Sequence, residues 1–333
     1  METFNFPYNW KMRTGYPKEK NGYSVFSCFS CGGGSTMGYK LAGYTVIGCN
    51  EIDPKIMQVY IENHNPKYYF TKSICDLKNK KKFPDVFYNL DILDGSPPCS
   101  SFSMAGNREK DWGKSKKFRE GQADQILDTL FFDFITLAKK LQPKIVIAEN
   151  VKGILLGNAI KYVAQIYKDF EDAGYFLFHK LLDASTMGVP QKRQRVFFFG
   201  IRKDLVKHIQ MKGLFQDIPK LDLKFNCEKI PLQLFYEKIL KRKTQNYSDK
   251  RFGDIILNLN RAAPTLTTLS RYWIDLDFLI NTNTIIKIGT FPQDYNFLNI
   301  TPGYLIGMSV PPVMMAQISK QVQIQWLDKI YGI

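Results

Sequence analysis

The sequence predicts an α/β fold in which a parallel sheet carries helices on its faces. Between Tyr23 and Gly200, short apolar runs alternate with longer stretches of helical periodicity, as in repeated strand–helix units. Two of the expected strands run into loops rich in glycine or proline, at the sheet edge where α/β proteins bind ligands. A chain of 333 residues, 44% of them hydrophobic, can form one large domain and a smaller one.

Six strands are expected where short apolar runs are bounded by turn residues or helical stretches, and three longer segments have a helical pattern. In residues 158–173, apolar side chains recur on one helical face, and Gly174 then ends the helix. The other two helices are expected at residues 122–141 and 311–327. The six strands are expected at residues 23–29, 45–50, 91–94, 144–149, 175–182 and 195–201.

The overall charge is strongly positive, with 46 Lys and Arg against 31 Asp and Glu. This excess favours a polyanionic partner, although charge alone leaves an indifferent basic surface as an alternative. Six cysteines are too few for a disulfide framework, residues 1–21 contain no apolar signal core, and no apolar run could span a bilayer. We therefore expect a cytoplasmic protein with reduced thiols and no membrane association.

The first loop is a glycine-rich turn, SCGGGS at residues 30–35, between a strand and a helix. Glycines there let a ligand approach the backbone and the helix N-terminus. Glu51, just after the second strand, can accept both hydroxyls of a ribose, so an adenosine-type cofactor is indicated. Cys28 and Cys31 form a C-x-x-C pair, but no second pair or nearby histidine supports a metal site, and none is expected.

The second loop, SPPCSSFS at residues 96–103, follows the third expected strand. Two prolines fix the path of the chain before Cys99, and a rigidly presented thiol suits covalent catalysis by a thiolate. A nicotinamide dehydrogenase could use the glycine turn and Glu51, but it gives no account of this loop.

Together with ENV at 149–151 and QKRQR at 191–195, these loops resemble the DNA cytosine-C5 methyltransferase family, of the bacterial or phage type. Further matches are TLFFD at 129–133, RAAPT at 261–265, FPQDY at 291–295, and Gly307 with Val310-Pro311. The ordered series runs from Phe29 to Pro312, and only residues 201–260 lack it.

The resemblance implies a reaction in which the Cys99 thiolate adds to cytosine C6, so that C5 can attack the methyl group of S-adenosylmethionine. Glu149 is then expected to be protonated or to share a proton with the base N3. Arg195 is expected to hydrogen-bond the base O2, and Arg193 to orient Glu149. Structural ion pairing of the two arginines is the alternative.

The resemblance also implies a Rossmann-like methyltransferase domain that binds S-adenosyl-L-methionine. Cys31 stands where the family usually has glycine, and Met308 where it has asparagine. Ser73 occupies the usual place of an adenine-contacting Asp, and Asp76 is a possible substitute. We expect these departures to tune cofactor affinity without abolishing activity. The expected cofactor-binding residues are Phe29, Ser30, Cys31, Gly32, Gly34, Glu51, Ile52, Ser73, Ile74, Ser96, Pro98, Leu130, Met308, Ser309 and Val310.

Double-stranded DNA is the expected substrate, with the target cytosine flipped out of the helix. Residues 201–260 hold 13 Lys and Arg against 7 Asp and Glu, at the place where the family has its target-recognition segment. We expect a catalytic domain at residues 1–200 and 301–333 and a recognition domain at 201–300. Residues 107–120 match a mobile catalytic loop. The expected DNA-contacting residues are Arg108, Lys116, Lys241, Arg242, Lys243, Lys250 and Arg251.

Two rival functions fit the same series of motifs. A tRNA cytosine-C5 methyltransferase would use the same catalytic residues, but the basic insert before residue 261 favours DNA. A non-catalytic DNA-binding regulator would be expected to have lost Cys99 or Glu149, and both are present. We expect a monomer that functions in restriction-modification or phage and host protection, with any cognate restriction endonuclease acting separately.

Overall fold

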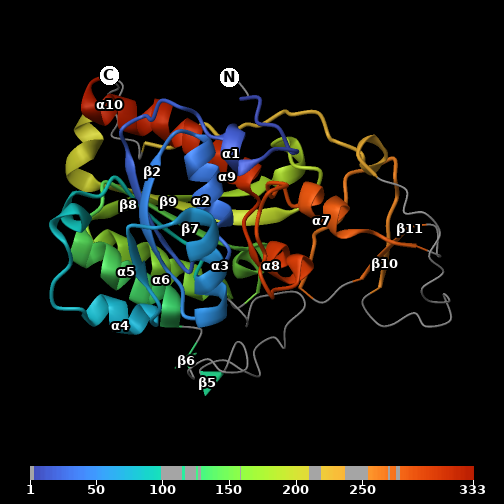
Figure 1. Cartoon of the computed structure of the whole chain (residues 1–333). Helices are drawn as coiled ribbons and strands as arrows, with labels where there is room; N and C mark the ends of the chain where they lie inside the picture. Colours follow the sequence, from blue (N-terminus) through green and yellow to red (C-terminus); the bar gives the residue numbers. More distant parts are fainter. Residues whose placement is uncertain are drawn as a thin grey trace.

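The computed structural model has a seven-stranded sheet at its centre, in the order β3-β2-β1-β4-β7-β9-β8 (Figure 1). It describes residues 4–98, 115–116, 125–126, 129–157, 159–209, 219–236, 254–268, 271–274 and 278–333. The strands are β1 (Ser24–Cys28), β2 (Thr45–Asn50), β3 (Tyr68–Phe70), β4 (Ile92–Gly95), β7 (Ile145–Val151), β8 (Tyr175–Asp183) and β9 (Gln194–Arg202).

All six predicted strands are present, but the prediction of a parallel sheet is wrong for one of them. β9 runs antiparallel to both of its neighbours, β7 and β8, whereas β3, β2, β1, β4 and β7 pair in parallel. The link between β8 and β9 is short, residues 184–193, and so lacks the crossover helix that a parallel pair requires. The short edge strand β3 was not predicted.

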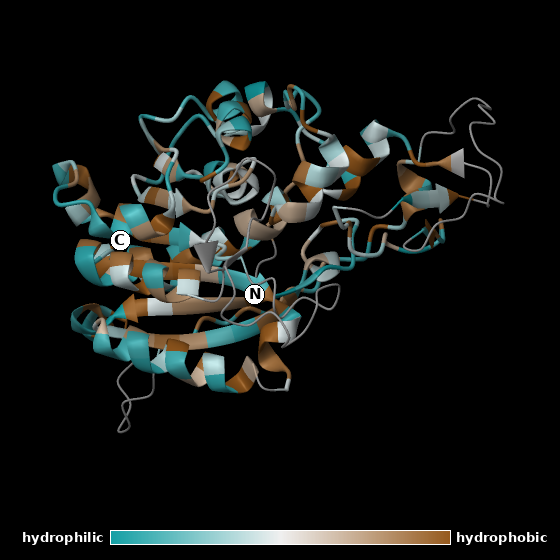
Figure 2. Ribbon diagram, turned by 90° about the horizontal axis from the view of Figure 1, so that it is seen from below, coloured by the Kyte–Doolittle hydropathy of each residue, from teal (hydrophilic) through white to brown (hydrophobic). Residues whose placement is uncertain are grey.

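Helices cover both faces of the sheet. Successive side chains of a strand point to opposite faces of the sheet, so that in β1 Val25 packs in one core and Phe26 in the other. On one face pack α4 (Ile74–Asn79), α5 (Leu130–Leu141) and α6 (Ala159–Asp172). On the other pack α2 (Gly34–Leu41), α9 (Pro312–Val322) and the π-helical turn Gln323–Leu327. α3 (Pro54–His64) lies beside β2 through Cys49, Met57 and Tyr60. Figure 2 shows apolar residues on the strands of the central sheet and a mixture of apolar and polar residues along the visible helices.

The start of one predicted helix is wrong. Helix was expected from residue 122, but α5 begins at Leu130 and Gln125–Ile126 forms the short strand β6, paired with β5 (Ser115–Lys116). A backbone paired across strands at 125–126 is incompatible with a helical turn there. The predicted helices at 158–173 and 311–327 are confirmed within a residue at either end, the latter as α9 and the π-helical turn.

A smaller part of the molecule extends from one side of the central sheet and contains β10 (Ile255–Ile256), β11 (Tyr272–Ile274) and β12 (Phe278–Leu279) (Figure 1). A third core joins its residues to α2, α3, α7 (Thr282–Ile288), α8 (Pro302–Met308) and the N-terminal segment with α1 (Met12–Gly15). Beyond residue 200, Leu205, Val206 and Leu221 still pack in the core under α9. The domain boundaries stay a prediction. The described part of the chain contains no helix with the length and apolar character needed to cross a bilayer.

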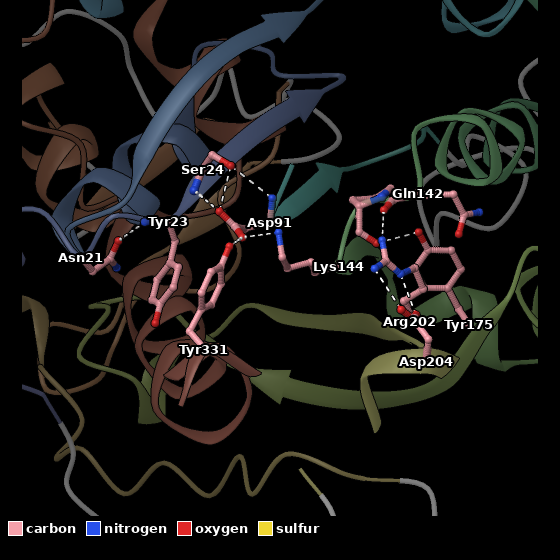
Figure 3. Close-up of polar contacts among 11 residues, drawn as sticks. Asn21, Tyr23, Ser24, Asp91, Gln142, Lys144, Tyr175, Arg202, Asp204 and Tyr331 are labelled. Atoms are coloured by element: carbon pink, nitrogen blue, oxygen red, sulfur yellow. Dashed lines mark hydrogen bonds and ion pairs between the residues drawn. The ribbon is translucent and has the colours of Figure 1, made fainter. Parts of the chain in front are cut away.

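Asp91 anchors the amino-terminal edge of the sheet (Figure 3). This buried carboxylate accepts hydrogen bonds from Ser24 N at 2.8 Å, Ser24 Oγ at 2.9 Å and Tyr331 OH at 2.6 Å, and pairs with Lys144 at 3.0 Å. It therefore connects β1, the segment leading into β7, and the C-terminal helix α10 (Asp328–Tyr331). Segments from both ends of the chain depend on this contact.

We expect Asp91→Asn to lower the free energy of unfolding by about 3 kcal/mol, because Lys144 would lose the counter-ion of a largely buried pair. Urea denaturation measures the change. Asp204→Asn is the control, since Asp204 is 60% exposed in its pair with Arg202 and should lose less than about 1 kcal/mol. Equal losses in the two variants would show that the Asp91 cluster is no anchor.

Candidate active site

One cavity of about 330 Å³ lies where β1, β2, β4 and β7 end. Because these strands are parallel, their carboxyl ends meet at a single edge and the loops that follow them converge. The cavity has Glu51 and Ile52 in its wall after β2, Ser96 and Pro98 after β4, and Glu149 in β7. The two predicted halves of the site, one for the cofactor and one for the base, therefore share a single space.

The first loop is held by the buried carboxylate of Glu51. Its two oxygens accept hydrogen bonds from Cys31 N at 3.0 Å and Asp53 N at 2.9 Å. Burial raises the pKa of Glu51, and these backbone hydrogen bonds oppose the rise. A carboxylate has about four acceptor positions, so two accepted bonds leave capacity for a ligand hydroxyl.

The second loop is tied to β7 by Asn150. Its side-chain amide donates to the Pro97 carbonyl at 3.3 Å, and its side-chain oxygen accepts from Val151 N at 2.8 Å. The amide fixes the stretch Pro97-Pro98 at the wall of the cavity. Cys99, the predicted nucleophile, lies immediately beyond the described residues, and its position stays a prediction.

Glu149 and the two arginines all face the cavity, but their contacts differ from those expected. Arg195, rather than Arg193, holds Glu149, with a distance of 2.9 Å between Arg195 Nε and Glu149 Oε1. The buried Arg193 instead donates to the carbonyls of Leu266 at 3.1 Å and Gly307 at 3.0 Å. The prediction that Arg193 orients Glu149 is therefore wrong as a direct contact, because the terminal nitrogens of Arg193 bond to two backbone carbonyls instead.

Electrostatics nevertheless link the three groups. Burial, and the nearby charge of Arg195, lower the pKa of Arg193 to about 9, while Glu149 raises it. Burial also lowers the pKa of Arg195, again opposed by Glu149. Arg193 Nε is buried with no hydrogen-bond partner among the described residues. This end of the cavity thus holds two positive groups, Arg193 and Arg195, beside the carboxyl group of Glu149, which suits a ligand that gains negative charge.

Nine of the predicted cofactor residues line the cavity: Phe29, Cys31, Glu51, Ile52, Ser73, Ile74, Ser96, Pro98 and Met308. The other six, Ser30, Gly32, Gly34, Leu130, Ser309 and Val310, are not among its lining residues. For Gly34 the reason is packing, since a Cβ there would lie 2.2 Å from the Val310 carbonyl oxygen. Ser73 caps α4, whereas the alternative Asp76 is exposed and does not line the cavity.

Eight lining residues were not predicted: Asn50, Ile56, Lys72, Pro97, Asn150, Val151, Tyr304 and Gly307. Five of them, Asn50, Pro97, Asn150, Val151 and Gly307, adjoin predicted residues in the same motifs, so their places in the sequence were a usable signal. The side chain of Asn50 donates to the carbonyls of Phe70 at 3.0 Å and Lys72 at 2.7 Å. This contact brings the segment after β3 to the cavity, and nothing in the local sequence pattern indicates it.

The two cysteines of the C-x-x-C pair lie in different surroundings. Cys28 is buried within β1, as expected, and Cys31 lines the cavity. Within the described ranges, no group of three His, Cys, Asp or Glu residues is placed to hold a metal ion. The predicted DNA-contacting residues Arg108, Lys241, Arg242, Lys243, Lys250 and Arg251 lie outside the described residues, as does the side chain of Lys116.

The family model for the C-5 cytosine-specific DNA methylases matches residues 23–273. The chain belongs to this family. The Type II methyltransferase M1.HphI of Haemophilus parahaemolyticus is 33% identical over 328 residues, which cover 88% of this chain and 85% of that protein. M.FnuDI of Fusobacterium nucleatum, also a Type II methyltransferase, is 38% identical over 181 residues, or 54% of this chain. That alignment spans about half of the relative, 47%.

The fold of this family member has close structural neighbours. The structure of a Spodoptera frugiperda DNMT2 mutant matches with a TM-score of 0.64 and 17% identity, covering 93% of this chain and 100% of the other. With the seven-stranded sheet, this likeness confirms the predicted Rossmann-like methyltransferase fold.

Asp94 lies on β4 just before the second loop and is buried. It accepts hydrogen bonds from Ser27 Oγ at 2.8 Å and Tyr39 OH at 3.2 Å. Burial raises the pKa of Asp94 to about 7, the two hydrogen bonds oppose the rise, and the charge of Glu149 adds to it. The folded protein therefore binds this proton more tightly than the unfolded chain does.

The stabilisation from protonated Asp94 is fully present below pH 3.8, its ordinary pKa, and is lost as the pH rises towards 7. We expect Asp94→Asn to remove this loss, about 4 kcal/mol in full and about 3 kcal/mol between pH 4.5 and 7.5, from the pH profile. Urea denaturation of wild type and variant from pH 4.5 to 7.5 measures the difference. The exposed Asp172→Asn is the control and should keep the wild-type slope. Parallel profiles for Asp94→Asn and wild type would refute the assignment.

Proposed function

We propose that this protein methylates cytosine C5 in DNA, with S-adenosylmethionine as the methyl donor. The observation that carries the proposal is the single cavity that joins Glu51, the expected cofactor carboxylate, to Glu149 and Arg195, the expected base-binding pair. Family membership gives this arrangement its chemical meaning.

The cavity suits an adenosine-bearing donor. Glu51 has spare acceptor capacity for ribose hydroxyls, and the apolar side chains of Ile52, Ile56 and Ile74 offer a surface for a flat purine. We propose that Cys31 and Met308 line the methionine end. The bound donor supplies an electrophilic methyl group, which this chain's residues would place beside the base.

The reaction we propose begins when the Cys99 thiolate forms a bond to cytosine C6. Electron density moves towards N3 and C5, and Glu149 supplies or shares the proton at N3. C5 then takes the methyl group, and the rest of the donor leaves as S-adenosylhomocysteine. Water accepts the C5 proton, elimination breaks the bond between sulfur and C6 to restore the thiolate, and the N3 proton returns to Glu149. The hold of Asn150 on the Pro97 carbonyl fits the need for a rigid approach to Cys99.

The ion pair between Arg195 and Glu149 suggests how charge is balanced. Before the base enters, Arg195 neutralises the carboxylate of Glu149, and both side chains are largely buried. We propose that the base O2 then accepts a hydrogen bond from this guanidinium, while the Glu149 carboxyl group turns towards N3. Arg193 fixes the segments around Leu266 and Gly307, and its charge attracts Glu149.

Double-stranded DNA is the proposed substrate, because the formal charge is +15 and the basic segment 201–260 fits target recognition. We propose a recognition domain within residues 201–300 and phosphate contacts from the predicted arginines and lysines. We propose a cytoplasmic monomer, since one duplex flips one base at a time. Any cognate restriction endonuclease would act separately.

Incubation with labelled S-adenosylmethionine and duplex DNA should yield 5-methylcytosine at one short sequence with wild type and none with Cys99→Ser, because serine lacks a thiolate nucleophile. Nucleoside analysis and sequencing of the product provide the readout. Labelling of tRNA with no labelling of DNA would favour the alternative function, a tRNA cytosine-C5 methyltransferase. Labelling of neither substrate would contradict the proposal.

Glu149→Gln should lower kcat by about a hundredfold or more, because the base N3 would lose its proton donor. Donor affinity, measured by calorimetry with S-adenosylmethionine, should change less than twofold, since Glu149 lies at the base end of the cavity. Glu171→Gln is the matched control, because Glu171 is 72% exposed and should change neither quantity. A wild-type kcat in Glu149→Gln would show that Glu149 is not the proton donor to the base N3.

A further inference from the structure

A buried cluster lies beneath the first loop, on the side away from the cavity. The Gly32 carbonyl oxygen accepts a hydrogen bond from Tyr295 OH at 2.6 Å and lies 3.2 Å from His64 Nε2. Tyr295 belongs to the segment after α7, and His64 is the last residue of α3. Two side chains that are far apart in the sequence therefore hold one peptide group of the loop.

The same loop is fixed on the other side of Cys31. Cys31 N donates to Glu51, and Gly33 N donates to Ser30 O at 2.8 Å. The peptide groups before Cys31 and after Gly32 are therefore both held, and Cys31 is kept at a φ of 47°, in the left-handed region. A residue other than glycine adopts this conformation at a cost, so the surrounding contacts must maintain it.

The packing leaves little room for the loop to move. A Cβ on Gly32 would lie 2.5 Å from Leu305 Cδ2 and 2.9 Å from Tyr295 OH. A Cβ on Gly33 would lie 2.1 Å from His64 Nε2. Leu305 belongs to α8, which also brings Gly307 and Met308 to the cavity wall. The position of Gly32 thus sets where Cys31 and the end of α8 lie.

The two contacting side chains are suited to donate without adding charge. A carbonyl can only accept, so the contact with Gly32 requires the His64 tautomer with a proton on Nε2. Burial lowers the pKa of His64 to about 3 and raises that of Tyr295 well above its ordinary value. Both groups are therefore neutral donors at physiological pH, and they place no positive charge under a site for a cationic methyl donor.

We propose that Tyr295 and His64 are positioning residues for the methyl donor, which act by holding the Gly32 carbonyl and through it the Cys31 wall of the cavity. The inference rests on the proposed function, because it takes the occupant of this part of the cavity to be S-adenosylmethionine. It assigns to the FPQDY segment and to the end of α3 a role in donor affinity, at a distance from the reacting atoms.

Tyr295→Phe removes one hydroxyl and keeps the ring, so the loop should loosen without a cavity being created. We expect the KM for S-adenosylmethionine, and its calorimetric Kd, to rise about tenfold, while kcat at saturating donor stays within twofold. Tyr60→Phe is the matched control. It removes another buried hydroxyl, which contacts Thr36 Oγ1 at 2.7 Å and does not contact Gly32. The ring centroid of Tyr60 lies 4.5 Å from that of His64, so the two variants alter the same neighbourhood.

The control should lose stability to a similar degree and keep the wild-type KM and Kd for the donor. His64→Leu should also raise the KM for the donor, and His64→Gln, which retains a neutral N–H donor, should restore most of the affinity. Thermal unfolding of every variant separates loss of folding from loss of donor affinity.

Wild-type affinity in both Tyr295→Phe and His64→Leu would overturn the inference, and so would a rise of equal size in Tyr60→Phe. A fall in kcat with an unchanged KM would also contradict it, because positioning of the donor acts on binding. Failure of the proposed function is distinguishable: wild type would then show no heat of binding with S-adenosylmethionine. Binding by wild type, with no effect of the variants, refutes only the positioning role.

Discussion

The parallel pairing of β2, β1, β4 and β7 is the constraint on which the site depends. Because these strands run in the same direction, the chain leaves each of them at one edge of the sheet. Four features therefore converge on one cavity: the glycine loop, the carboxylate of Glu51, the proline loop and Glu149. Asp91 at the opposite edge supports this arrangement by joining β1, the start of β7 and the C-terminal helix.

For the buried ionisable groups near the cavity, burial shifts the pKa in one direction and a neighbouring group opposes the shift. Desolvation raises the pKa of Glu51 and Asp94, and hydrogen bonds from backbone or hydroxyl groups offset part of that effect. Desolvation lowers the pKa of Arg193 and Arg195, and Glu149 offsets it. The desolvation of Glu51, Arg193 and Arg195 is thus offset by neighbouring groups, and a ligand that alters the charge of Glu149 also affects both arginines. This coupling fits catalysis of a reaction in which negative charge develops and is then lost.

Sequence periodicity was sufficient to predict six of the seven strands of the central sheet, because short apolar runs mark them, as residues 196–201 of β9 illustrate. It was insufficient for the direction of β9, since parallel and antiparallel strands buried on both faces have the same composition. It also placed the start of α5 too early, because polar residues before Leu130 are compatible with a helix when only local propensity is considered. Strand pairing at Gln125–Ile126 depends on a partner elsewhere in the chain.

By itself, the sequence determined the residue types that the chemistry requires and their order along the chain. Glu51 could be identified from its place after the second strand, whereas Glu149 and the paired arginines were identified from the resemblance of their motifs to those of a known family. The tertiary structure decided which of these groups touch: Arg195 rather than Arg193 contacts Glu149, Asn50 draws the Lys72 segment to the cavity, and Tyr295 reaches Gly32. These contacts join residues far apart in the sequence, and their distances follow from how helices and strands pack, which local patterns do not encode.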